Sequence, residues 1–253
     1  MRFASLGSGS RGNALIVESG STRILVDCGF GPRELTARLA RIGLLPEAVD
    51  AVIVTHEHGD HVGGVVRCAA RFGFDIHLSH GTCVAAELDD KVEVSRFDSH
   101  RAFAVKDLEI QPFPVPHDAR EPTQFVIGNG RFRLGVLTDA GSVTPHMIAM
   151  LDGCDALMLE CNHDLGMLEN SNYPKSVKQR IAGRLGHLDN GAAADLLSKI
   201  DRRRLQHVVA AHLSEQNNLP QLAQLALAGS LGCKPADVPV ATQQFGFDWR
   251  TIC

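Results

Sequence analysis

The stretch Thr55-His56-Glu57-His58-Gly59-Asp60-His61-Val62-Gly63-Gly64 follows directly on the apolar run Ala51–Val54. Within six residues it offers four side chains of the types that bind divalent metals, namely His56, His58, Asp60 and His61. Alternation along a strand would place the first two histidines on one face, and a tight turn at Gly59 would direct the other pair toward a second point. Ionisable groups crowd at the end of a buried strand only when something compensates them, so a chance polar turn is disfavoured. The stretch therefore predicts two adjacent metal sites.

Three later apolar runs each end in a further ligand-type side chain. They are Pro114-Val115-Pro116-His117, Val136-Leu137-Thr138-Asp139 and Val209-Ala210-Ala211-His212. One cluster cannot complete two coordination spheres, and the ends of strands supply ligands on a rigid scaffold. We therefore expect His117, Asp139 and His212 to take part in metal binding.

The composition is that of a globular protein with an excess of histidine. The chain has 253 residues, 44% of them hydrophobic, and it contains 12 His but 1 Trp and 1 Tyr. A net charge of −4 excludes a globally basic nucleic-acid-binding surface, although a local basic face is compatible with it. The 7 cysteines are scattered without a C-x-x-C pair, which indicates reduced thiols rather than a disulfide framework or a zinc knuckle.

No segment of the sequence has the pattern of a secretion signal or a membrane span. The first residues lack a charged region followed by an apolar one, and no apolar run approaches the roughly 18 residues that a span requires. We therefore expect a cytoplasmic protein with no membrane partner.

Short β-branched runs separated by turn residues predict most of the strands. The expected strands are Arg2–Leu6, Ala14–Glu18, Arg23–Asp27, Ala51–Thr55, Asp75–Leu78, Glu109–Pro112, Gln124–Ile127, Phe132–Leu137, Ala156–Glu160 and His207–Ala211, with a closing strand near Val240. Helices are expected over Pro32–Ile42, Val62–Phe72, Pro174–Leu185, Gly191–Ile200 and about Pro220–Ala228. Two runs of strands, each followed by helices and with no linker between them, predict a four-layer α/β sandwich in a single domain over residues 1–253.

The segment Gly7-Ser8-Gly9-Ser10-Arg11-Gly12 matches the dinucleotide-binding pattern G-x-G-x-x-G, but its context does not. That pattern requires a helix to begin at the third glycine, whereas Asn13 leads into the β-branched run Ala14–Val17. We interpret the segment as a hairpin turn in which Ser8 and Asn13 are candidate contacts for an anion.

The ordered ligand residues carry a family resemblance. The run Thr55–Gly64, followed by His117, Asp139 and His212, resembles the metallo-β-lactamase superfamily, and the resemblance covers nearly the whole chain. Within that superfamily the chain is most similar to the YycJ/WalJ group, a nuclease group related to ribonuclease J and to the tRNA 3′-processing enzymes. The segments that carry this narrower similarity are Ser5–Asn13, Glu160–Asp164, Gly186–Leu188 and Ala211–Asn218. The resemblance implies the αβ/βα sandwich of the metallo-β-lactamase type.

The resemblance also implies how the ligands divide between two metal ions. One ion is expected on His56, His58 and His117, the other on Asp60, His61 and His212, with Asp139 bridging them. Zinc suits this imidazole-rich set, and manganese or iron are alternatives. Two such ions would activate a bridging hydroxide for hydrolysis, and Asp60 is counted with the catalytic residues.

A hydrolase of this kind needs a proton donor for the departing alkoxide. His187 lies between two expected helices and is not needed as a ligand, so it is the candidate acid. Glu160 ends an apolar strand and is the candidate to orient and charge this imidazole. A glutamate and a histidine in these places are similar to those of the tRNA 3′-processing endonucleases. A surface or helix-capping role for His187 is the alternative.

Basic residues near His187 are candidates for binding the substrate. Lys175 and Lys178 lie one helical turn apart in a segment that also holds Arg180 and Arg184, and Arg202-Arg203-Arg204 follows on the next connection. Such local positive charge fits the phosphate backbone of a nucleic acid. A solvated helix face is the alternative.

Two polar residues after the strand that ends at Glu160 are further candidates. Asn162 and His163 are placed to contact the substrate, but His163 could equally hold the loop by bonds to the backbone. The scarcity of Trp and Tyr favours recognition of a nucleic-acid backbone over stacking on its bases.

Together these features predict a dinuclear metal-dependent phosphodiesterase that acts on nucleic acid, with a DNA exonuclease as the expected kind. Alternatives are a small-molecule phosphodiesterase, a thioester hydrolase of the glyoxalase II type, and a metal-binding regulator that has lost catalysis. A homodimer is compatible with the resemblance, because the related nucleases often form dimers.

Overall fold

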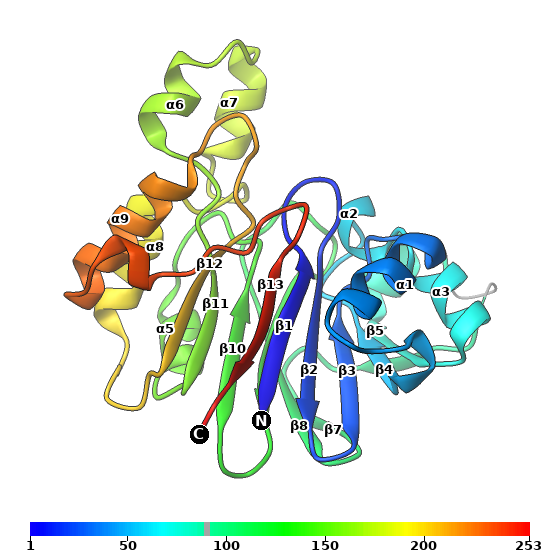
Figure 1. The fold of residues 1–253 in the computed structure, drawn as a ribbon. Coiled ribbons are helices and arrows are strands. Elements are labelled where there is room, and N and C mark those ends of the chain that lie inside the picture. The colour runs from blue at the N-terminus through cyan, green and yellow to red at the C-terminus, as the bar shows by residue number, and fades with distance from the viewer. Residues whose placement is uncertain (89–91) are drawn as a thin grey trace.

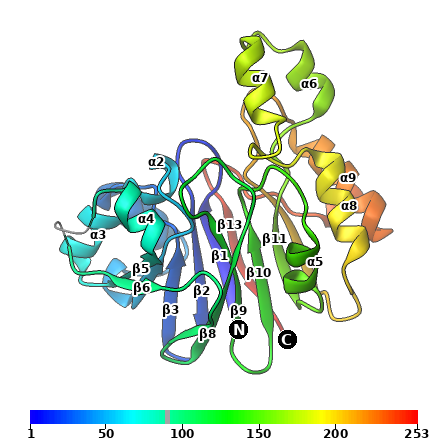
Figure 2. The ribbon, with the colours of Figure 1, turned by 180° about the vertical axis from the view of Figure 1, so that it is seen from behind.

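The computed structural model describes residues 1–88 and 92–253. Within these residues the strands form two sheets that face each other, and helices cover the outer face of each sheet (Figure 1). Figure 2 shows the same layers from behind. This is the four-layer αβ/βα sandwich that the sequence predicts. Both termini lie at one end of the sandwich, and a helical arm projects from the other end (Figure 1).

The first sheet has the strand order β13-β1-β2-β3-β4-β5-β6. Its strands are β1 (Arg2–Gly7), β2 (Ala14–Ser19), β3 (Thr22–Val26), β4 (Ala51–Ile53), β5 (Asp75–Ser79), β6 (Ser95–Phe97) and β13 (Phe247–Thr251). β1, β2 and β3 pair as antiparallel neighbours, whereas β3, β4, β5 and β6 run parallel. The glycine-rich segment after β1 is therefore a hairpin connection and opens no helix.

The second sheet has the strand order β12-β11-β10-β9-β8-β7. Its strands are β7 (Phe103–Val105), β8 (Leu108–Pro114), β9 (Thr123–Gly128), β10 (Arg133–Leu137), β11 (Ala156–Glu160) and β12 (His207–Ala211). β9 is antiparallel to both β8 and β10, and β10, β11 and β12 run parallel. The carboxyl ends of β8, β10, β11 and β12 consequently lie at the same edge of the sheet.

The helices flank the sheets in two groups. Beside the first sheet lie α1 (Pro32–Arg41), the 3-10 helix η1 (Pro46–Ala48), α2 (Gly59–Val62), α3 (Val65–Phe72) and α4 (His80–Ala85). Beside the second sheet lie α5 (Pro145–Leu151), α8 (Asn190–Lys199), α9 (Pro220–Leu231) and the 3-10 helix η2 (Pro235–Asp237). The arm consists of α6 (Leu165–Asn170) and α7 (Lys175–Ile181) (Figure 1). None of the described helices combines the length and the apolar character needed to cross a bilayer.

Alternation along the strands divides the core into layers. In β2, Leu15 and Val17 join the cluster between the two sheets, whereas Ile16 packs with residues of α1 and α3. In β11, Met158 lies between the sheets and Leu157 packs with residues of α5, α8 and α9. Strands that are buried on both faces have nearly continuous apolar sequences, and this explains why these strands were readable from the sequence.

The structure corrects two of the expected helices. The helix expected over Val62–Phe72 is divided into α2 and α3, with Gly63 and Gly64 between them. At Gly64 the chain passes so close to Phe30 that a Cβ would lie 1.8 Å from its carbonyl oxygen. The helix expected over Pro174–Leu185 ends already at Ile181.

The prediction of a closing strand near Val240 was wrong. Val240 forms only an isolated bridge with Ala210, and its neighbour Pro239 has no N–H to donate to a ladder. The closing strand is β13, which pairs antiparallel with β1. Among the other elements that the sequence does not predict, β6, β7, α4, α5 and α6 have at most seven residues each, too few for a clear periodic pattern.

Candidate metal centre

Loops that leave the carboxyl ends of the strands meet at one edge of the sandwich. Residues 54–61 follow β4, and His117, Asp139 and His212 follow β8, β10 and β12. The backbone N–H of Thr123 donates to the carbonyl oxygen of Thr55 at 3.0 Å and ties the two sheets together here. All seven ligand candidates from the sequence lie at this edge.

The local geometry of the first cluster differs from the expected one. β4 ends at Ile53, so His56 and His58 lie in a loop rather than on a strand. Gly59 begins the short helix α2 instead of forming a tight turn, and His58 is the residue that precedes it. Helix α2 carries Asp60 and His61 back toward the strand ends. The four side chains converge as expected, but a loop and a helix bring them there.

The convergence produces four overlapping groups of potential metal ligands among the described residues. In each group the ligand atoms lie within 4.8 Å of one another. The groups are His56, His58 and His117; His56, His61 and Asp139; Asp60, His61 and His212; and Asp139, Glu160, His187 and His212. Asp139 and the histidines shared between groups connect them into one continuous centre.

The first group consists of three imidazoles, and oxygen atoms hold the outer nitrogen of two of them, His56 and His117. His56 Nδ1 lies 2.9 Å from the Thr55 hydroxyl, and His117 Nδ1 donates to the carbonyl oxygen of Gly186 at 2.9 Å. His117 Nε2 lies 3.3 Å from His58 Nδ1. Burial lowers the pKa of both His56 and His117, aided by neighbouring histidines. Neutral imidazoles with a fixed tautomer are the form that binds a metal ion.

The group of Asp60, His61 and His212, together with Asp139, combines carboxylates with charged imidazoles. His61 Nε2 lies 3.2 Å from Asp60 Oδ2 and 3.2 Å from Asp139 Oδ2. Burial opposes the charge on His61, but Asp139 and its neighbouring acids outweigh burial and raise its pKa well above the usual value. The same balance of burial against nearby carboxylates raises the pKa of His212 to about 10. In the absence of a metal, protons therefore compensate the acids of this group.

The donor atoms of the centre fit divalent metal ions. His56 Nε2 is a buried side-chain nitrogen without a hydrogen-bond partner in the structure. Buried polar atoms are nearly always satisfied, so this nitrogen indicates a missing partner. Imidazole nitrogens and carboxylate oxygens are the donors that zinc and related ions accept.

Asp27 belongs to this centre, and the sequence analysis missed its role. It follows β3, and its carboxylate lies 2.8 Å from His61 Nδ1 and accepts from the Thr55 N–H at 2.8 Å and from the Thr55 hydroxyl. A carboxylate on Nδ1 leaves Nε2 of the imidazole to face the centre. The available signal was an acid directly after the apolar run Ile24-Leu25-Val26, the same pattern that identified Asp139.

Two residues of the centre have left-handed backbone conformations. Asp27 has φ of 61° and His212 has φ of 53°. Side chains other than glycine adopt this region at a cost, and such strain persists where the surroundings hold it for function. The φ angles of these two residues are therefore held by the contacts of the centre and not by the conformational preference of the residues themselves.

Glu160 and His187 form a pair at the rim of the centre. His187 Nδ1 lies 2.8 Å from Glu160 Oε1 and 3.5 Å from Asp139 Oδ1. Glu160 is fully buried, and its Oε2 accepts from the N–H groups of Ala140 and Leu188. Burial would raise the pKa of Glu160, but the charge and hydrogen bond of His187 lower it to about 2. The side chain of His187 is 21% exposed, so the imidazole connects the buried acid with the surface.

Three of the proposed substrate contacts make bonds to the centre itself. Ser8 Oγ accepts from the N–H of His212 at 2.9 Å. Asn13 Nδ2 donates to Asp60 Oδ2 at 3.1 Å, and Asn162 Nδ2 donates to the carbonyl oxygen of His212 at 3.0 Å. In this structure these groups position ligand candidates.

The arm carries the proposed basic contacts. Lys175 is exposed on α7, and Lys178 Nζ donates to the carbonyl oxygen of Glu169 at 2.7 Å. Arg180 Nε donates to Asp118 Oδ2 at 2.6 Å, which ties α7 to the loop that holds His117. The arm is therefore attached beside the centre.

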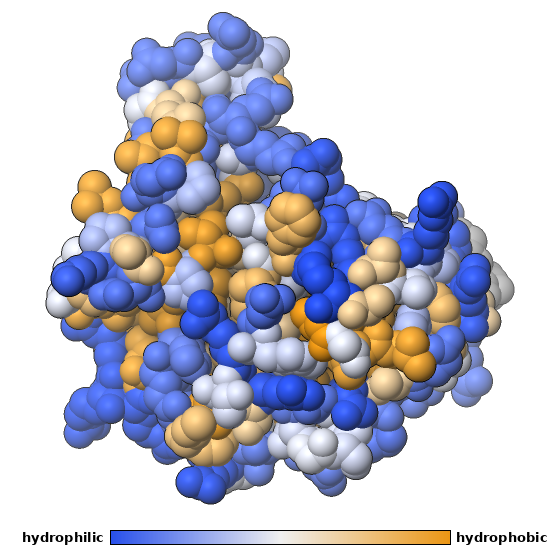
Figure 3. Space-filling model, viewed as in Figure 1, coloured by the Kyte–Doolittle hydropathy of each residue, from blue (hydrophilic) through white to orange (hydrophobic). Residues whose placement is uncertain are grey.

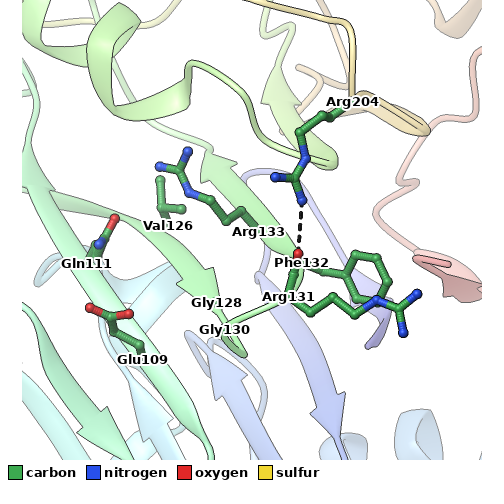
Figure 4. Close-up of a pocket in the computed structure, with 9 residues that line it drawn as sticks. All are labelled: Glu109, Gln111, Val126, Gly128, Gly130, Arg131, Phe132, Arg133 and Arg204. Atoms are coloured by element: carbon green, nitrogen blue, oxygen red, sulfur yellow. Dashed lines mark hydrogen bonds between the residues drawn. The ribbon is translucent and has the colours of Figure 1, made fainter.

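The run Arg202-Arg203-Arg204 lies elsewhere, and its grouping with the arm was wrong. It precedes β12, whereas His212 follows β12, so the run is at the opposite edge of the parallel strands. Figure 4 shows the hollow at that edge, where Arg204 donates to the carbonyl oxygen of Arg131 at 2.9 Å. Arg204 also pairs with Asp155, and Arg203 pairs with Asp201. The order and direction of the strands decide at which edge of the sheet a connecting loop lies. The charges in the local sequence do not reveal that edge.

Comparison with known proteins agrees with the fold and the centre. A family model described as the beta-lactamase superfamily domain matches residues 22–212. Exodeoxyribonuclease WalJ of Streptococcus pneumoniae is 33% identical over 236 residues, which cover 91% of this chain and 88% of the relative. Exodeoxyribonuclease YycJ of Bacillus anthracis is 33% identical over 235 residues, which cover 90% and 88%.

A solved structure of similar fold is the metallo-β-lactamase fold protein YhfI from Bacillus subtilis, with a TM-score of 0.75 over 99% of both chains and 16% identity. At that identity the likeness concerns the fold alone. The family model, the two relatives and the converging His and Asp groups all lead to the same assignment. The chain belongs to the metallo-β-lactamase superfamily and is a metal-dependent hydrolase of that fold, homologous to the exodeoxyribonucleases WalJ and YycJ.

Proposed function

We propose that the chain is a phosphodiesterase that degrades nucleic acid, with DNA as its substrate and cleavage from a chain end as its mode. The observation that carries this proposal is the Glu160–His187 pair beside Asp139, with Nδ1 to Oε1 at 2.8 Å. Hydrolysis of a phosphodiester between nucleotides expels an alkoxide, which needs a proton. The names of the two relatives, both exodeoxyribonucleases, support the choice of polymer and mode. Residues 1–253 would act as one catalytic domain.

The residues of the centre would hold two divalent ions. His56, His58 and His117 would hold one, and Asp60, His61 and His212 the other. Asp139 would bridge them, because one oxygen lies 3.2 Å from His61 Nε2 and the other 3.8 Å from His117 Nε2. We propose zinc, which suits an imidazole-rich set. Bound ions would supply activation of the attacking water and stabilisation of charge on the phosphate.

His187 would supply the proton. Glu160 holds Nδ1 of the imidazole through its Oε1. This leaves Nε2 as the nitrogen that can donate to the departing oxygen. Glu160 is itself fixed by two backbone N–H groups, so the position of the acid is set by the fold. A rigid support of this kind is what proton transfer over hydrogen-bond distance requires.

The arm would bind the phosphate backbone. Its tip is hydrophilic, whereas hydrophobic residues gather over α9 and the base of the arm (Figure 3). Lys175 is exposed there, and the Arg180–Asp118 pair fixes α7 beside the centre. The chain as a whole has a net charge of −4. Local positive charge on the arm would therefore attract phosphate mainly at the approach to the centre.

Digestion of end-labelled DNA and RNA with zinc-reconstituted protein tests the proposal. Single- and double-stranded forms of each polymer should be compared, and DNA should be shortened stepwise from one end. Fragments from internal cleavage would contradict the exonuclease mode, and preferential cleavage of RNA would contradict the choice of DNA. Failure on all polymers, with turnover of a small phosphodiester or a thioester, would replace the proposal by the corresponding small-molecule hydrolase.

A further inference from the structure

A cavity of about 290 Å³ lies directly beside His187. The loop after Asp139, the first residue of α6 and one face of α8 form its walls. Its lining includes His163, Ser142, Val143, Leu165, Ala192 and Asp195. His187 belongs both to this lining and to the metal centre, so the cavity opens next to the proposed acid.

His163 in the wall of this cavity is buried without a partner for either ring nitrogen. The residue is 1% exposed, and both Nδ1 and Nε2 lack a hydrogen-bond partner. Each unsatisfied buried donor or acceptor lowers the stability of the fold. A fold that retains such a residue needs a reason for it, and a missing ligand at the cavity is one.

The backbone directs His163 toward the cavity and away from the metal ligands. The carbonyl oxygen of His163 accepts from the N–H of Asn190 at 2.9 Å, and the N–H of Asn162 donates to the carbonyl oxygen of Leu188 at 2.9 Å. Successive side chains of an extended segment point to opposite faces. Asn162 uses its side chain on His212, so the imidazole of His163 turns to the other side.

The chemistry of the walls fits an uncharged planar ring better than a phosphate. Val143, Leu165 and Ala192 supply apolar surface, and His163 supplies ring nitrogens that can donate or accept. Asp189 and Asp195 contribute two carboxylates against the single ammonium group of Lys199. This excess of negative charge disfavours a phosphate, and a carboxylate accepts from an amino or imino group. The volume is at the lower end of ligand pockets, about 300 Å³, and leaves room for one ring system rather than a length of chain.

We infer that this cavity receives the base of the nucleoside that departs with the oxygen protonated by His187. The inference rests on the proposed function, since it takes the role of His187 from there. The departing group must lie on the side of its proton donor, and this cavity is the hollow that His187 lines. A turn of the buried imidazole toward the base would give a nitrogen of His163 its partner, and the base would set the position of the sugar oxygen relative to His187.

Substrates that lack one base test the inference. The test uses a DNA strand that the zinc-loaded protein cleaves, and the same strand with a tetrahydrofuran abasic residue on one side or the other of the scissile phosphate. Loss of the base on the departing side should lower kcat/KM by about tenfold, the effect of roughly one buried hydrogen bond. Loss of the base on the other side should have a much smaller effect.

Two variants connect this preference to the cavity. Ala192→Leu fills the cavity, and His163→Phe keeps a planar ring but removes both nitrogens; each should bring the ratio of kcat/KM between base-bearing and abasic strands close to one. Ser198→Leu lies on an exposed position of α8 outside the cavity and should keep the wild-type ratio. His163→Phe should also fold at least as stably as the wild type, because it removes two unsatisfied buried atoms.

The outcomes separate the two proposals. If the wild type cleaves DNA but Ala192→Leu and His163→Phe leave the ratio at its wild-type value, the cavity inference is overturned and the proposed function stands. If a missing base has the same effect on both sides of the phosphate, the cavity inference is overturned as well. If the metal-loaded wild type cleaves no DNA, the proposed function fails and the cavity inference fails with it.

Discussion

Glu160 holds His187 through a contact of 2.8 Å between Glu160 Oε1 and His187 Nδ1. The second carboxylate oxygen of Glu160 accepts from the backbone N–H groups of Ala140 and Leu188. The carboxylate is fully buried, and the imidazole that it holds is partly exposed. This arrangement fixes the position of one imidazole at the rim of the metal centre. It also distinguishes His187 from five of the seven ligand candidates, His56, His61, His117, Asp139 and His212, which are buried.

Removing the imidazole of His187 should slow hydrolysis without emptying the centre. We expect His187→Ala to lower kcat by about 10²–10⁴-fold on a phosphodiester with an alkoxide leaving group. The loss should be smaller on bis-p-nitrophenyl phosphate, because nitrophenolate departs with less need of a proton. Steady-state kinetics on both substrates and metal analysis of the purified variant check this. A fall in metal content would show His187 to be a ligand instead.

Glu160→Gln should weaken the same step through His187. The amide keeps the shape of the side chain but carries no charge, so it holds Nδ1 of His187 by a weaker hydrogen bond. We expect kcat on a phosphodiester with an alkoxide leaving group to fall more than kcat on bis-p-nitrophenyl phosphate, with zinc content equal to that of the wild type. Glu109→Gln, which changes an exposed glutamate on β8, is the matched control and should leave both values in place. Unchanged kcat on both substrates in Glu160→Gln would contradict the positioning role.

Asp27 should determine the metal affinity of the site that includes His61. Its carboxylate lies 2.8 Å from His61 Nδ1, so Asp27→Asn removes the charge that orients this ligand. Loss of such a partner lowers metal affinity by about 10–100-fold. Competition with a chromogenic zinc chelator measures the affinity, and Asp107→Asn, at the β7–β8 turn, is the control. If Asp27→Asn and Asp107→Asn bind zinc with equal affinity, Asp27 does not support the metal site.

Metal loading should depend on pH through His61 and His212. Nearby carboxylates, opposed by burial, raise the pKa of both imidazoles, to about 10 for His212. Their protonation stabilises the metal-free fold fully below the ordinary pKa near 6.5, and the contribution of His212 is lost as the pH rises through about 10. A metal ion must displace these protons, so zinc affinity should fall as the pH is lowered. Calorimetry in buffers of different ionisation enthalpy should detect proton release, and its absence at pH 7 would contradict the prediction.

The arm should contribute to DNA binding in a salt-dependent way. Lys175→Gln removes one exposed positive charge beside the centre, which should weaken binding and reduce the slope of log K against log salt by about one. Lys234→Gln, at an exposed position next to η2, is the matched control. Titration of labelled DNA at several salt concentrations gives both slopes. If the two variants have the same slope as the wild type, Lys175 on α7 is only exposed to solvent and does not contact the DNA backbone.

Much of the fold was readable because it follows from local patterns. The strands β2 and β11 are buried on both faces, so their apolar runs stand out, and glycine-rich turns mark where they end. Elements of three to seven residues at the margins have no such pattern. The closing strand was misplaced because pairing of β13 with β1 joins the two ends of the chain, a contact that no local window contains.

The sequence by itself determined the chemistry of this protein: which side chains can bind metal, and that each segment holding them follows an apolar run. Donor type and periodicity are properties of short segments, so they can be recognised without a structure. Only the tertiary structure decided that His56 and His58 lie in a loop and Asp60 and His61 on a helix, that Asp27 holds His61, and that Arg204 lies at the far edge of the sheet. These relations depend on strand order and direction, which are set by pairing between segments distant in the chain.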